Sequence, residues 1–507
     1  MDWRLWAGLL VGVYAVVGLV GFQRTLTPDE IRPLLLAAGP WREQLEFARQ
    51  DLVNTPASYF LTRLWLQLVG HTDTGAKMFA LLVNVPTLVL FTVLARRMTS
   101  YWPVASLLCA AVYLRVGGTP NLVRMYGLLL LCIVAAILLW LRWRERPSAG
   151  LLVAWLALMV LAVCMHASAL LTLPAFVIGT WLYGPAQRLF TVAAALVALA
   201  LLPWLVFVGD VYADRGLDAN VDWIQDNPTK AVAELPFLVL SGEDPGADSP
   251  LGEKYRTRGI PATLKWLALL LHVALFTFAT PRLLAAGPPH RARDEIARSF
   301  WTAALFAAVP VAVLYLFSIT IAPVMHARYL LVALPGYLLL VTVAARLGGQ
   351  PARGVLAVIA IWMLGSAGTA LALNLEPTAA RRVVALLNRE LCPSDVVVVE
   401  RHMPLGWEIQ WEWTRRLGRQ EPLVILTVDW TPHWLGDIVP GVDLDKLDVR
   451  HAERVWFIHR DHRRVQEFRG HLAEQGFEPA PFEGAFAAVD LFERPARASS
   501  IPSSITQ

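Results

Sequence analysis

Long apolar stretches separated by short polar turns recur along the first three quarters of the chain. Each stretch approaches the length that a helix needs to cross roughly 30 Å of hydrocarbon. We predict eleven membrane spans: Trp6–Phe22, Ala76–Leu94, Trp102–Leu114, Leu122–Leu141, Leu151–Met165, Ala167–Leu182, Phe190–Val208, Leu264–Phe278, Phe300–Ile321, Tyr329–Ala345 and Val355–Leu373. The pattern indicates a polytopic α-helical membrane protein.

The first apolar run could be mistaken for a secretion signal, because Arg4 precedes the stretch Leu5–Val20. The residues that follow, 21–24, contain no small-x-small cleavage site. We therefore expect a retained first helix. The apolar stretch Ala57–Val69 is short and carries Arg63, so we expect it to lie at the outer membrane interface as an amphipathic helix.

The distribution of arginines predicts the orientation. If the N-terminus lies inside, every short inner turn carries at least one arginine, as the positive-inside rule requires. These inner residues are Arg96, Arg97, Arg142, Arg144, Arg146, Arg188, Arg282, Arg291, Arg293, Arg298, Arg346 and Arg353. If the stretch 57–69 crossed the membrane, the later arginine-rich turns would face outward. We therefore predict a cytoplasmic N-terminus and an outer C-terminal domain, in what we expect to be a bacterial plasma membrane.

Composition agrees with this class of protein. Of the 507 residues, 56% are hydrophobic and 17% charged, with a mean hydropathy of +0.50, so much of the apolar surface must face lipid. The net charge is +4, and the absence of a basic run interleaved with aromatic residues argues against nucleic-acid binding. The four cysteines have no spacing typical of a disulfide framework or a metal site.

From about Asn374 the composition becomes that of a soluble domain. Short apolar runs predict buried strands, and helical patterns separate them. The strands are expected at 395–399, 423–428 and 455–458, and the helices at Ala379–Leu391, Trp407–Leu417 and His462–Gln475. We thus predict a transmembrane domain at 1–374 with outer loops 23–75 and 209–262, a small α/β domain at 375–493, and a disordered tail at 494–507. No internal repeat is visible.

Two adjacent carboxylates, Asp29 and Glu30, follow the first span. A carboxylate near low-dielectric lipid has a raised pKa and can serve as a general base. The alternative is a helix N-terminus, with Thr27 as cap, Pro28 in the first turn and acidic residues favoured by the helix dipole. The pattern alone leaves both interpretations open.

Further polar residues gather at the predicted outer ends of the spans. An arginine there can either extend to the lipid headgroups or hold a phosphate with its planar fork of donors. The residues concerned are Arg124 and Tyr126 at one span, His166 in a tight turn, and His326, Arg328 and Tyr329 at a later span. Ionisable residues at the membrane suggest a function, and these all reach one predicted face.

These motifs resemble those of GT-C membrane glycosyltransferases, a glycosyltransferase family 39-like group that includes protein O-mannosyltransferases and the bacterial aminoarabinose transferase that modifies lipid A. The likeness covers the acidic pair, the 56–70 helix, the inner turn at 95–97, and the segments 124–129, 165–166 and 327–335, in order through most of residues 1–375. The chain departs from the family at Asn54-Thr55-Pro56, where relatives carry His-Pro-Pro, and at Lys77, where relatives carry arginine.

The resemblance implies an inverting sugar transfer from a polyprenyl-phosphate donor to a glycolipid, glycan or protein at the outer face. Asp29 would be the catalytic base, and Glu30, the other catalytic candidate, would orient the loop or cap a donor. The residues implied to bind the donor phosphate are Arg124, Tyr126, His326, Arg328 and Tyr329, and further candidate site residues are His166, Lys77 and Tyr59. No metal or other cofactor is required, because arginines can neutralise a leaving monophosphate. We expect Asp29, Glu30, Arg124 and Arg328 to line one cavity.

Other functions are also considered. A transporter or flippase would carry charged residues in mid-membrane and internal repeats; here the span interiors are nearly free of charge, and no repeat is visible. A polymerase or ligase of lipid-linked glycans would have a related fold, and the sequence separates it poorly from a transferase. A membrane sensor would bind through the outer domain, whose His402, His433, His459, Asp461 and His462 lack the spacing of metal ligands.

Overall fold

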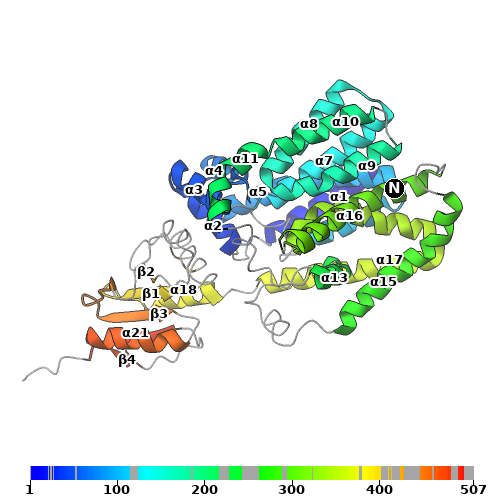
Figure 1. The fold of residues 1–507 in the computed structure, drawn as a ribbon. Helices are drawn as coiled ribbons and strands as arrows, with labels where there is room; N and C mark the ends of the chain where they lie inside the picture. The colour runs from blue at the N-terminus through cyan, green and yellow to red at the C-terminus, as the bar shows by residue number, and fades with distance from the viewer. Residues whose placement is uncertain are drawn as a thin grey trace, which may run out of the picture. The chain divides into compact units, whose positions relative to one another are not determined.

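The computed structural model is mostly helical, with one small sheet (Figure 1). It describes residues 2–20, 22, 26, 28–51, 54–114, 124–183, 186–215, 228–241, 262–287, 294–322, 324–375, 379–400, 409, 413, 423–426, 446–458, 462–480 and 489–495. The chain divides into two compact units, one of residues 1–24 and 37–376, the other of residues 25–36 and 377–507. The division between Glu376 and Pro377 falls next to the boundary expected at 374, but the segment Thr25–Leu36 groups with the second unit. Each unit is described by itself.

Apolar helices make up most of the first unit. They are α1 (Trp3–Val20), α5 (Asp73–Met98), α6 (Trp102–Leu114), α7 (Tyr126–Glu145), α8 (Ala149–Met165), α9 (Leu173–Tyr183), α10 (Gln187–Leu199), α11 (Leu202–Phe207), α15 (Ala262–Ala286), α16 (Glu295–Thr320) and α17 (Leu334–Leu375). Two 3₁₀ helices, η3 (Ala167–Thr172) and η5 (Ala327–Ala333), precede α9 and α17. Each predicted span overlaps at least one of these helices.

Seven helices in the described part of the chain are long and apolar enough to cross a membrane, and α6, α8 and the η3–α9 segment are shorter apolar helices. One of the seven runs from Arg328 to Ala372. Its main part, α17, is interrupted by Gly349, whose φ of 72° and ψ of −146° are not helical. Two predicted spans therefore coincide with this one long element. The number of crossings, eleven, stays a prediction.

Exposed apolar side chains on single helix faces indicate where this unit meets lipid. On α1, the residues Leu5, Leu9, Val13 and Val16 are all more than half exposed, and they recur every three or four positions. A similar row of exposed leucines and valines follows α10 and α11, including Leu196 and Leu199. A water-soluble protein rarely exposes such continuous apolar surface, so this unit is an integral membrane domain.

The interior of this unit is packed around aromatic rings. Trp140 packs edge-on against Phe176 and Phe306 with ring centroids 5.9 and 5.4 Å away, and its indole N–H donates to Thr180 Oγ1 at 2.9 Å. Two glycines allow the helices to approach. A Cβ added at Gly179 would lie 2.7 Å from the Trp140 ring, and one at Gly336 would lie 2.4 Å from backbone carbon of Phe306.

Three helices lie in the loop between α1 and α5, namely α2 (Pro28–Ala38), α3 (Trp41–Asp51) and α4 (Pro56–Val69). The sequence predicts α4, which is too short to cross a bilayer and exposes 82% of Leu68 while burying Tyr59 and Leu66. This amphipathic pattern is typical of an interfacial helix. The guanidinium of Arg63 lies 4.2 Å from the Trp41 ring centroid, which joins α4 to α3.

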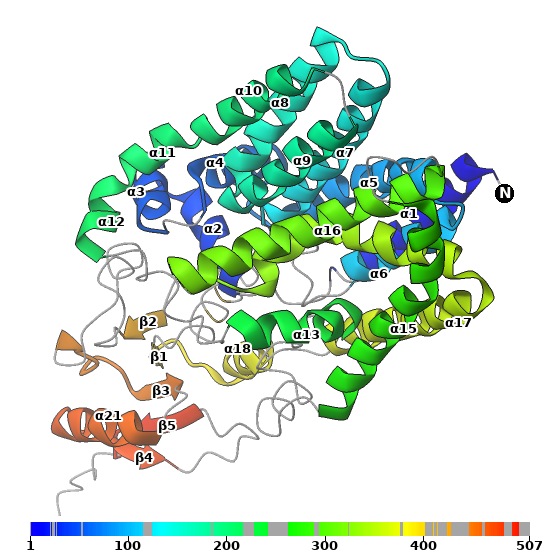
Figure 2. The ribbon, with the colours of Figure 1, turned by 45° about the vertical axis from the view of Figure 1, so that its right-hand side comes forward.

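One helix of the long loop expected at 209–262 was not predicted. Helix α13 (Pro228–Ser241) contacts α15 and α17, as Figure 2 shows. The side chains of Lys265 and Glu234 lie 2.5 Å apart in an ion pair, and Trp362 Nε1 donates to Ser241 Oγ at 3.0 Å. Pro236 and the charged residues obscure the apolar period of this segment. The helix α12 (Gly209–Arg215) also begins this loop.

The second unit contains a five-stranded sheet in the order β2-β1-β3-β5-β4. The strands are β1 (Val396–Glu400), β2 (Leu423–Leu426), β3 (Arg454–Ile458), β4 (Glu478–Ala480) and β5 (Val489–Glu493). Strand β1 pairs parallel with β2 and β3, whereas β5 pairs antiparallel with β3 and β4. The sequence predicted the first three strands within a few residues, but not β4 and β5.

Both faces of this sheet are buried. On one face Val398 and Phe457 cluster with Phe468 of α21 (His462–Glu474), and on the other Val397 and Trp456 cluster with α18 (Ala379–Glu390). Continuous apolar strands with a helix on each face are typical of a parallel α/β layer. Both helices were predicted. The helix expected at 407–417 and the tail at 496–507 lie outside the described residues.

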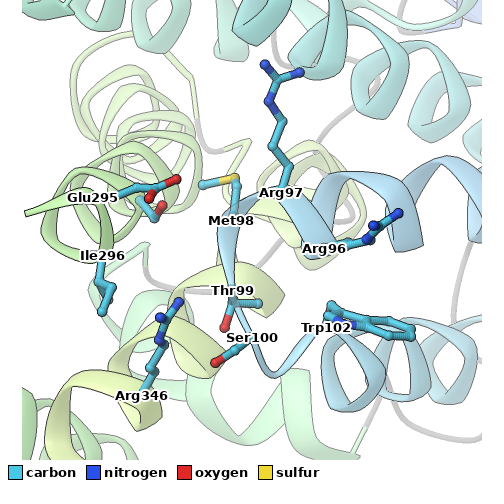
Figure 3. Close-up of a pocket in the computed structure, with 10 residues that line it drawn as sticks. Arg96, Arg97, Met98, Thr99, Ser100, Trp102, Glu295, Ile296 and Arg346 are labelled. Carbon is cyan, nitrogen blue, oxygen red and sulfur yellow. The ribbon is translucent and has the colours of Figure 1, made fainter. Parts of the chain in front are cut away.

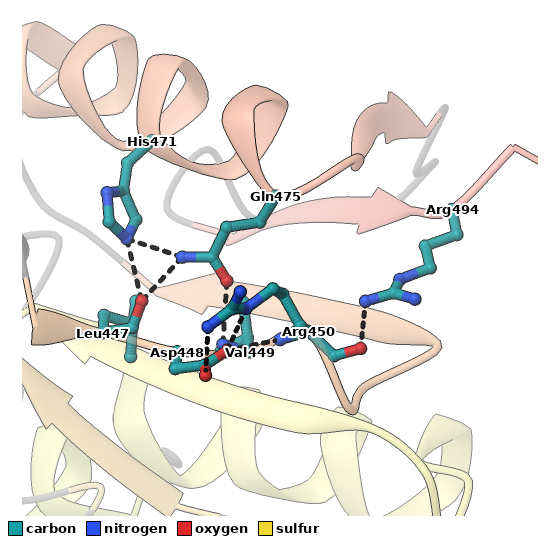
Figure 4. Close-up of polar contacts among 7 residues, drawn as sticks. All are labelled: Leu447, Asp448, Val449, Arg450, His471, Gln475 and Arg494. Atoms are coloured by element: carbon teal, nitrogen blue, oxygen red, sulfur yellow. Dashed lines mark hydrogen bonds and ion pairs between the residues drawn. The ribbon is translucent and has the colours of Figure 1, made fainter.

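Half-buried and exposed polar groups hold a loop beside this sheet. Figure 4 shows His471 of α21 and Gln475, which directly follows α21, both bonded to the carbonyl oxygen of Leu447, at 2.9 and 2.6 Å, while the Gln475 Oε1 accepts the N–H of Val449. Next to this loop, Asp448 pairs with Arg450 at 2.9 Å. These contacts give His471 a structural role.

Candidate functional site

Three chain segments meet at one end of the membrane unit and bring together most of the residues predicted to bind the donor phosphate. They are the start of α7, the turn between α8 and η3, and η5, and these elements contact one another. The ring of His166 lies between those of Tyr126 and Tyr329, with centroids 5.5 and 5.6 Å away. His326 packs edge-on against Tyr329 at 6.2 Å. We call Arg124, Tyr126, His166, His326, Arg328 and Tyr329 the outer cluster, after the face on which the sequence predicts them.

The two histidines of the outer cluster are held in the same way. Each is the N-cap of a 3₁₀ helix, and its Nδ1 accepts the backbone N–H two residues later: Ser168 N at 3.1 Å from His166, and Arg328 N at 3.3 Å from His326. The side chain therefore replaces the usual Ser, Thr, Asp or Asn cap. This local motif places each imidazole at the beginning of a helix that leads into a predicted span.

The hydrogen bonds of His166 define its protonation. Because Nδ1 accepts the N–H of Ser168, Nδ1 carries no proton, and the neutral ring must carry its proton on Nε2. The side chain is only 1% exposed, and its Nε2 has no hydrogen-bond partner among the described residues. A buried donor without a partner is unfavourable by roughly 1–3 kcal/mol. His166 thus presents one N–H to whatever occupies this site.

Two arginines give the outer cluster its charge. The guanidinium carbon of Arg124 lies 5.4 Å from the centroid of the Tyr126 ring, which orients the arginine by a cation–π contact. Arg328 is half-buried at the start of η5. The six residues of the outer cluster include two guanidinium groups and no carboxylate, so the cluster favours an anion.

The acidic pair belongs to the other compact unit. Helix α2 begins at Pro28, so Asp29 and Glu30 occupy its first turn, where the helix dipole favours negative charge. Glu30 is completely buried, and the side chain of Asp29 lies outside the described part of the chain. The cavity expected to join this pair with Arg124 and Arg328 stays a prediction, because the two units are described separately.

Lys77 and Tyr59 are placed by contacts outside the outer cluster. The Lys77 Nζ donates to the carbonyl oxygen of Phe22 at 2.7 Å and pairs with Asp73, so it ties α5 to the end of α1. Tyr59 is buried against Phe47 at a centroid distance of 5.5 Å. Both contacts are structural, and a role for either residue in binding stays a prediction.

Two residues near His166 were not singled out from the sequence. Ser168 bonds His166 Nδ1 through both its N–H and its hydroxyl group, the latter at 2.8 Å. Thr55 Oγ1 donates to the carbonyl oxygen of Cys164, which anchors the start of α4 beside the turn that holds His166. The only sequence signals were a serine two positions after a histidine and a threonine before Pro56.

No group of three or more His, Cys, Asp or Glu side chains that could hold a metal is present among the described residues. In the α/β domain, His402, His433, His459 and Asp461 lie outside those residues, and His462 begins α21. Comparison of the chain with known protein families and with curated protein sequences found no match.

Proposed function

We propose that this protein is an inverting glycosyltransferase that moves a sugar from a polyprenyl-phosphate donor to an acceptor at the outer face of the membrane. The observation that carries the proposal is the outer cluster. In it, two arginines and the available N–H of His166 lie together at one end of an integral membrane domain. Such a set of donors suits a phosphate attached to a lipid, since arginine recognises phosphate through its planar fork.

The proposed reaction is a direct displacement at the sugar C1. The oxygen of an acceptor hydroxyl attacks C1, the bond from C1 to the phosphate oxygen breaks, and polyprenyl phosphate leaves. The hydroxyl proton passes to the carboxylate of Asp29, which acts as general base. The configuration at C1 is inverted because attack and departure occur on opposite sides. We assign Glu30 to the support of Asp29, because the two point about 100° apart on a helix.

The outer cluster stabilises the leaving phosphate in this proposal. Charge grows on the phosphate oxygen as the bond breaks, and fixed donors that meet this charge lower the barrier. Arg124 and Arg328 supply positive charge. His166 supplies an N–H whose direction is set by the bond from Ser168 and by the flanking rings of Tyr126 and Tyr329. No step requires a metal ion or another cofactor.

The topology is part of the proposal. We infer eleven crossings, a cytoplasmic N-terminus and an outer α/β domain, with α4 at the outer interface. The support comes from the arginines of the inner turns. The outer position favours a lipid-linked donor, because nucleotide sugars are cytoplasmic.

The first experiment compares cells with and without the protein by mass spectrometry of envelope glycolipids and glycoproteins. A sugar modification that disappears with the protein identifies the acceptor and the sugar, and an unchanged envelope would contradict a transferase. The second uses purified protein, that acceptor and a synthetic polyprenyl-phosphate sugar. A transferase forms product in detergent, whereas a flippase or a sensor does not.

The purified protein also tests Asp29. Asp29→Asn keeps the shape of the side chain but removes the base, so transfer should fall by roughly two to four decades at normal protein yield. Arg188→Gln, at an exposed position on α10, is the control and should transfer normally. Full activity of Asp29→Asn would mean that another group is the base, and Glu30→Gln would then be examined.

A further inference from the structure

A basic pocket lies at the C-terminal end of α5, next to Met98. It has a volume of about 380 Å³, within the range of roughly 300–1,000 Å³ that small-molecule sites occupy. Its wall combines the end of α5, the turn to α6, the first turn of α16 and one residue of α17. The lining residues are Arg96, Arg97, Met98, Thr99, Ser100, Trp102, Glu295, Ile296, Ser299 and Arg346.

Figure 3 shows how the polar side chains are arranged. Arg346 extends from α17 toward the turn that carries Thr99 and Ser100, and Glu295 lies on the same side as Arg346. Arg96 and Trp102 lie on the opposite side of that turn. The lining includes three arginines and one glutamate, so its charge is positive.

The three arginines are not equally available. Arg97 pairs with Glu145 of α7, and the guanidinium of Arg96 stacks 5.5 Å from the Trp3 ring centroid. Within the described residues, no carboxylate forms an ion pair with Arg96 or Arg346. Two of the three guanidinium groups can therefore accept an anion without losing an existing ion pair.

The surroundings of the pocket identify the kind of anion. Trp102 packs edge-on against Trp6 of α1 at a centroid distance of 6.5 Å, and tryptophans are enriched at the level of lipid headgroups. Helix α1 also exposes Leu5 and Leu9 by 72% and 58%, which offers apolar surface for acyl chains. Basic pockets between transmembrane helices on the cytoplasmic side are known to hold anionic lipid headgroups.

We propose that this pocket binds the phosphate of an anionic phospholipid in the leaflet opposite the outer cluster, with Arg346 as the main ligand and Arg96 as the second. The hydroxyl groups of Thr99 and Ser100 supply additional donors. The inference is independent of sugar transfer, because it rests on a different end of the membrane unit and on different residues.

Native mass spectrometry of the full-length protein tests this proposal. The protein is released from nanodiscs that contain phosphatidylglycerol or only phosphatidylcholine. Each arginine near an anionic headgroup changes affinity by roughly fivefold, so Arg346→Gln should weaken phosphatidylglycerol binding about fivefold and the double variant with Arg96→Gln roughly twentyfold. Glu295→Gln should strengthen it, because a negative charge leaves the lining.

The matched control is Arg188→Gln, which should bind the lipid like the wild type. Arg188 is exposed on the same predicted face but does not line the pocket. The proposal would be overturned if Arg188→Gln weakened lipid binding as much as the pocket variants do. It would also be overturned if neither Glu295→Gln nor Arg96→Gln changed lipid binding, and this second result holds even if Arg346→Gln folds poorly. Inorganic phosphate distinguishes the two sources of the anion. Displacement of the lipid by millimolar phosphate would overturn a lipid site in favour of a free-phosphate site.

Discussion

His166 shows how one hydrogen bond can set the chemistry of a side chain. The N–H of Ser168 occupies Nδ1 and thereby moves the ring proton to Nε2. Burial between two tyrosines then removes water that would otherwise satisfy this donor. The residue is consequently a fixed, neutral donor, and it differs from the arginines beside it, which supply charge.

This difference leads to a prediction for His166. His166→Phe keeps a ring between Tyr126 and Tyr329 but removes the N–H. The rate of the proposed sugar transfer by purified protein should fall roughly 10- to 100-fold, which is at or below the smallest losses that follow removal of one oxyanion-hole donor in other enzymes. Stability should fall by about 0.5–2 kcal/mol, because the Ser168 N–H loses its cap, so the rate is compared at a temperature where both proteins are folded. His166→Gln supplies an amide N–H and should recover part of the rate. Equal rates for the His166→Phe variant and the wild type would show that His166 has no role in the reaction.

Asp395 is the other residue whose partners determine its state. Its side chain is fully buried and accepts bonds from Arg454 Nη2 at 2.7 Å, from the Cys392 N–H at 2.9 Å and from Trp456 Nε1 at 3.0 Å. Burial alone would raise the pKa of Asp395, but the bonds from Arg454, Cys392 and Trp456 outweigh burial and hold the pKa below its ordinary value.

Because the pKa is lowered in the folded state, the contribution of Asp395 to stability is complete above about pH 4, its unfolded pKa, and is lost as the pH falls through the folded value. Asp395→Ala leaves the N–H groups of Cys392 and Trp456 without their acceptor and Arg454 without its carboxylate, so it should destabilise the sheet by roughly 1–3 kcal/mol. Hydrogen exchange of β1 and β3 in the full-length protein measures this. Unchanged protection at pH 7 would show that the pair contributes little.

At the scale of elements, close contact between α16 and α17 depends on a single small residue. Gly336 lies against the backbone of Phe306 and Ala307, where an added Cβ would be 2.4 and 2.6 Å from backbone atoms. Backbone cannot move aside as a flexible side chain can. Small residues at helix interfaces are the usual way for membrane helices to approach one another.

Gly336→Ala should therefore force the two helices apart and destabilise the membrane unit by about 1–3 kcal/mol. The midpoint of thermal unfolding in detergent should fall. Gly365→Ala in the same helix is the matched control, because an added Cβ there meets no atom within 4 Å; it should leave the midpoint unchanged or raise it slightly. Equal midpoints for the two variants would contradict the contact.

Elements with a clear apolar period were predictable from the sequence, and others were not. The apolar runs of α6 and α8 and the valines of β1 are continuous, so their existence and bounds agree with the structure within a few residues. Helix α13 was missed because Pro236 and neighbouring charges interrupt its pattern. The short strand β4 contains a glutamate and a proline, which are disfavoured in strands.

The candidate site was predictable in part for a related reason. Arginine, tyrosine and histidine at the ends of apolar runs could be recognised in the sequence, since charge is rare there. Their mutual distances depend on how α7, η3 and η5 pack, and no local pattern contains that information. Thr55 acts through one hydrogen bond to the Cys164 carbonyl, and Ser168 through its N–H and hydroxyl contacts with His166; sequence alone does not reveal these contacts.

For the whole molecule, the outer position of the α/β domain can be tested with a native residue. Cys392 is exposed, whereas Cys109 and Cys132 are buried and Cys164 is half-buried. A membrane-impermeant maleimide should therefore label Cys392 in intact spheroplasts if the domain lies outside. Cys392→Ser should abolish the label. Labelling that appears only after the membrane is permeabilised would place the domain in the cytoplasm and reverse the proposed orientation.

The break in α17 has a consequence for biosynthesis. Gly349 adopts a conformation that L side chains rarely adopt, and Pro351 follows two residues later, so the two apolar halves of α17 have almost no connecting loop. Arg346 and Arg353 flank the break. If the two halves cross the membrane separately, as proposed, a translocon would accept them as one hairpin, and these arginines would retain its tip on the cytoplasmic side. Membrane insertion would then constrain the residue at position 346 in addition to the proposed lipid binding, and Arg353 would preserve the topological signal when Arg346 alone is replaced.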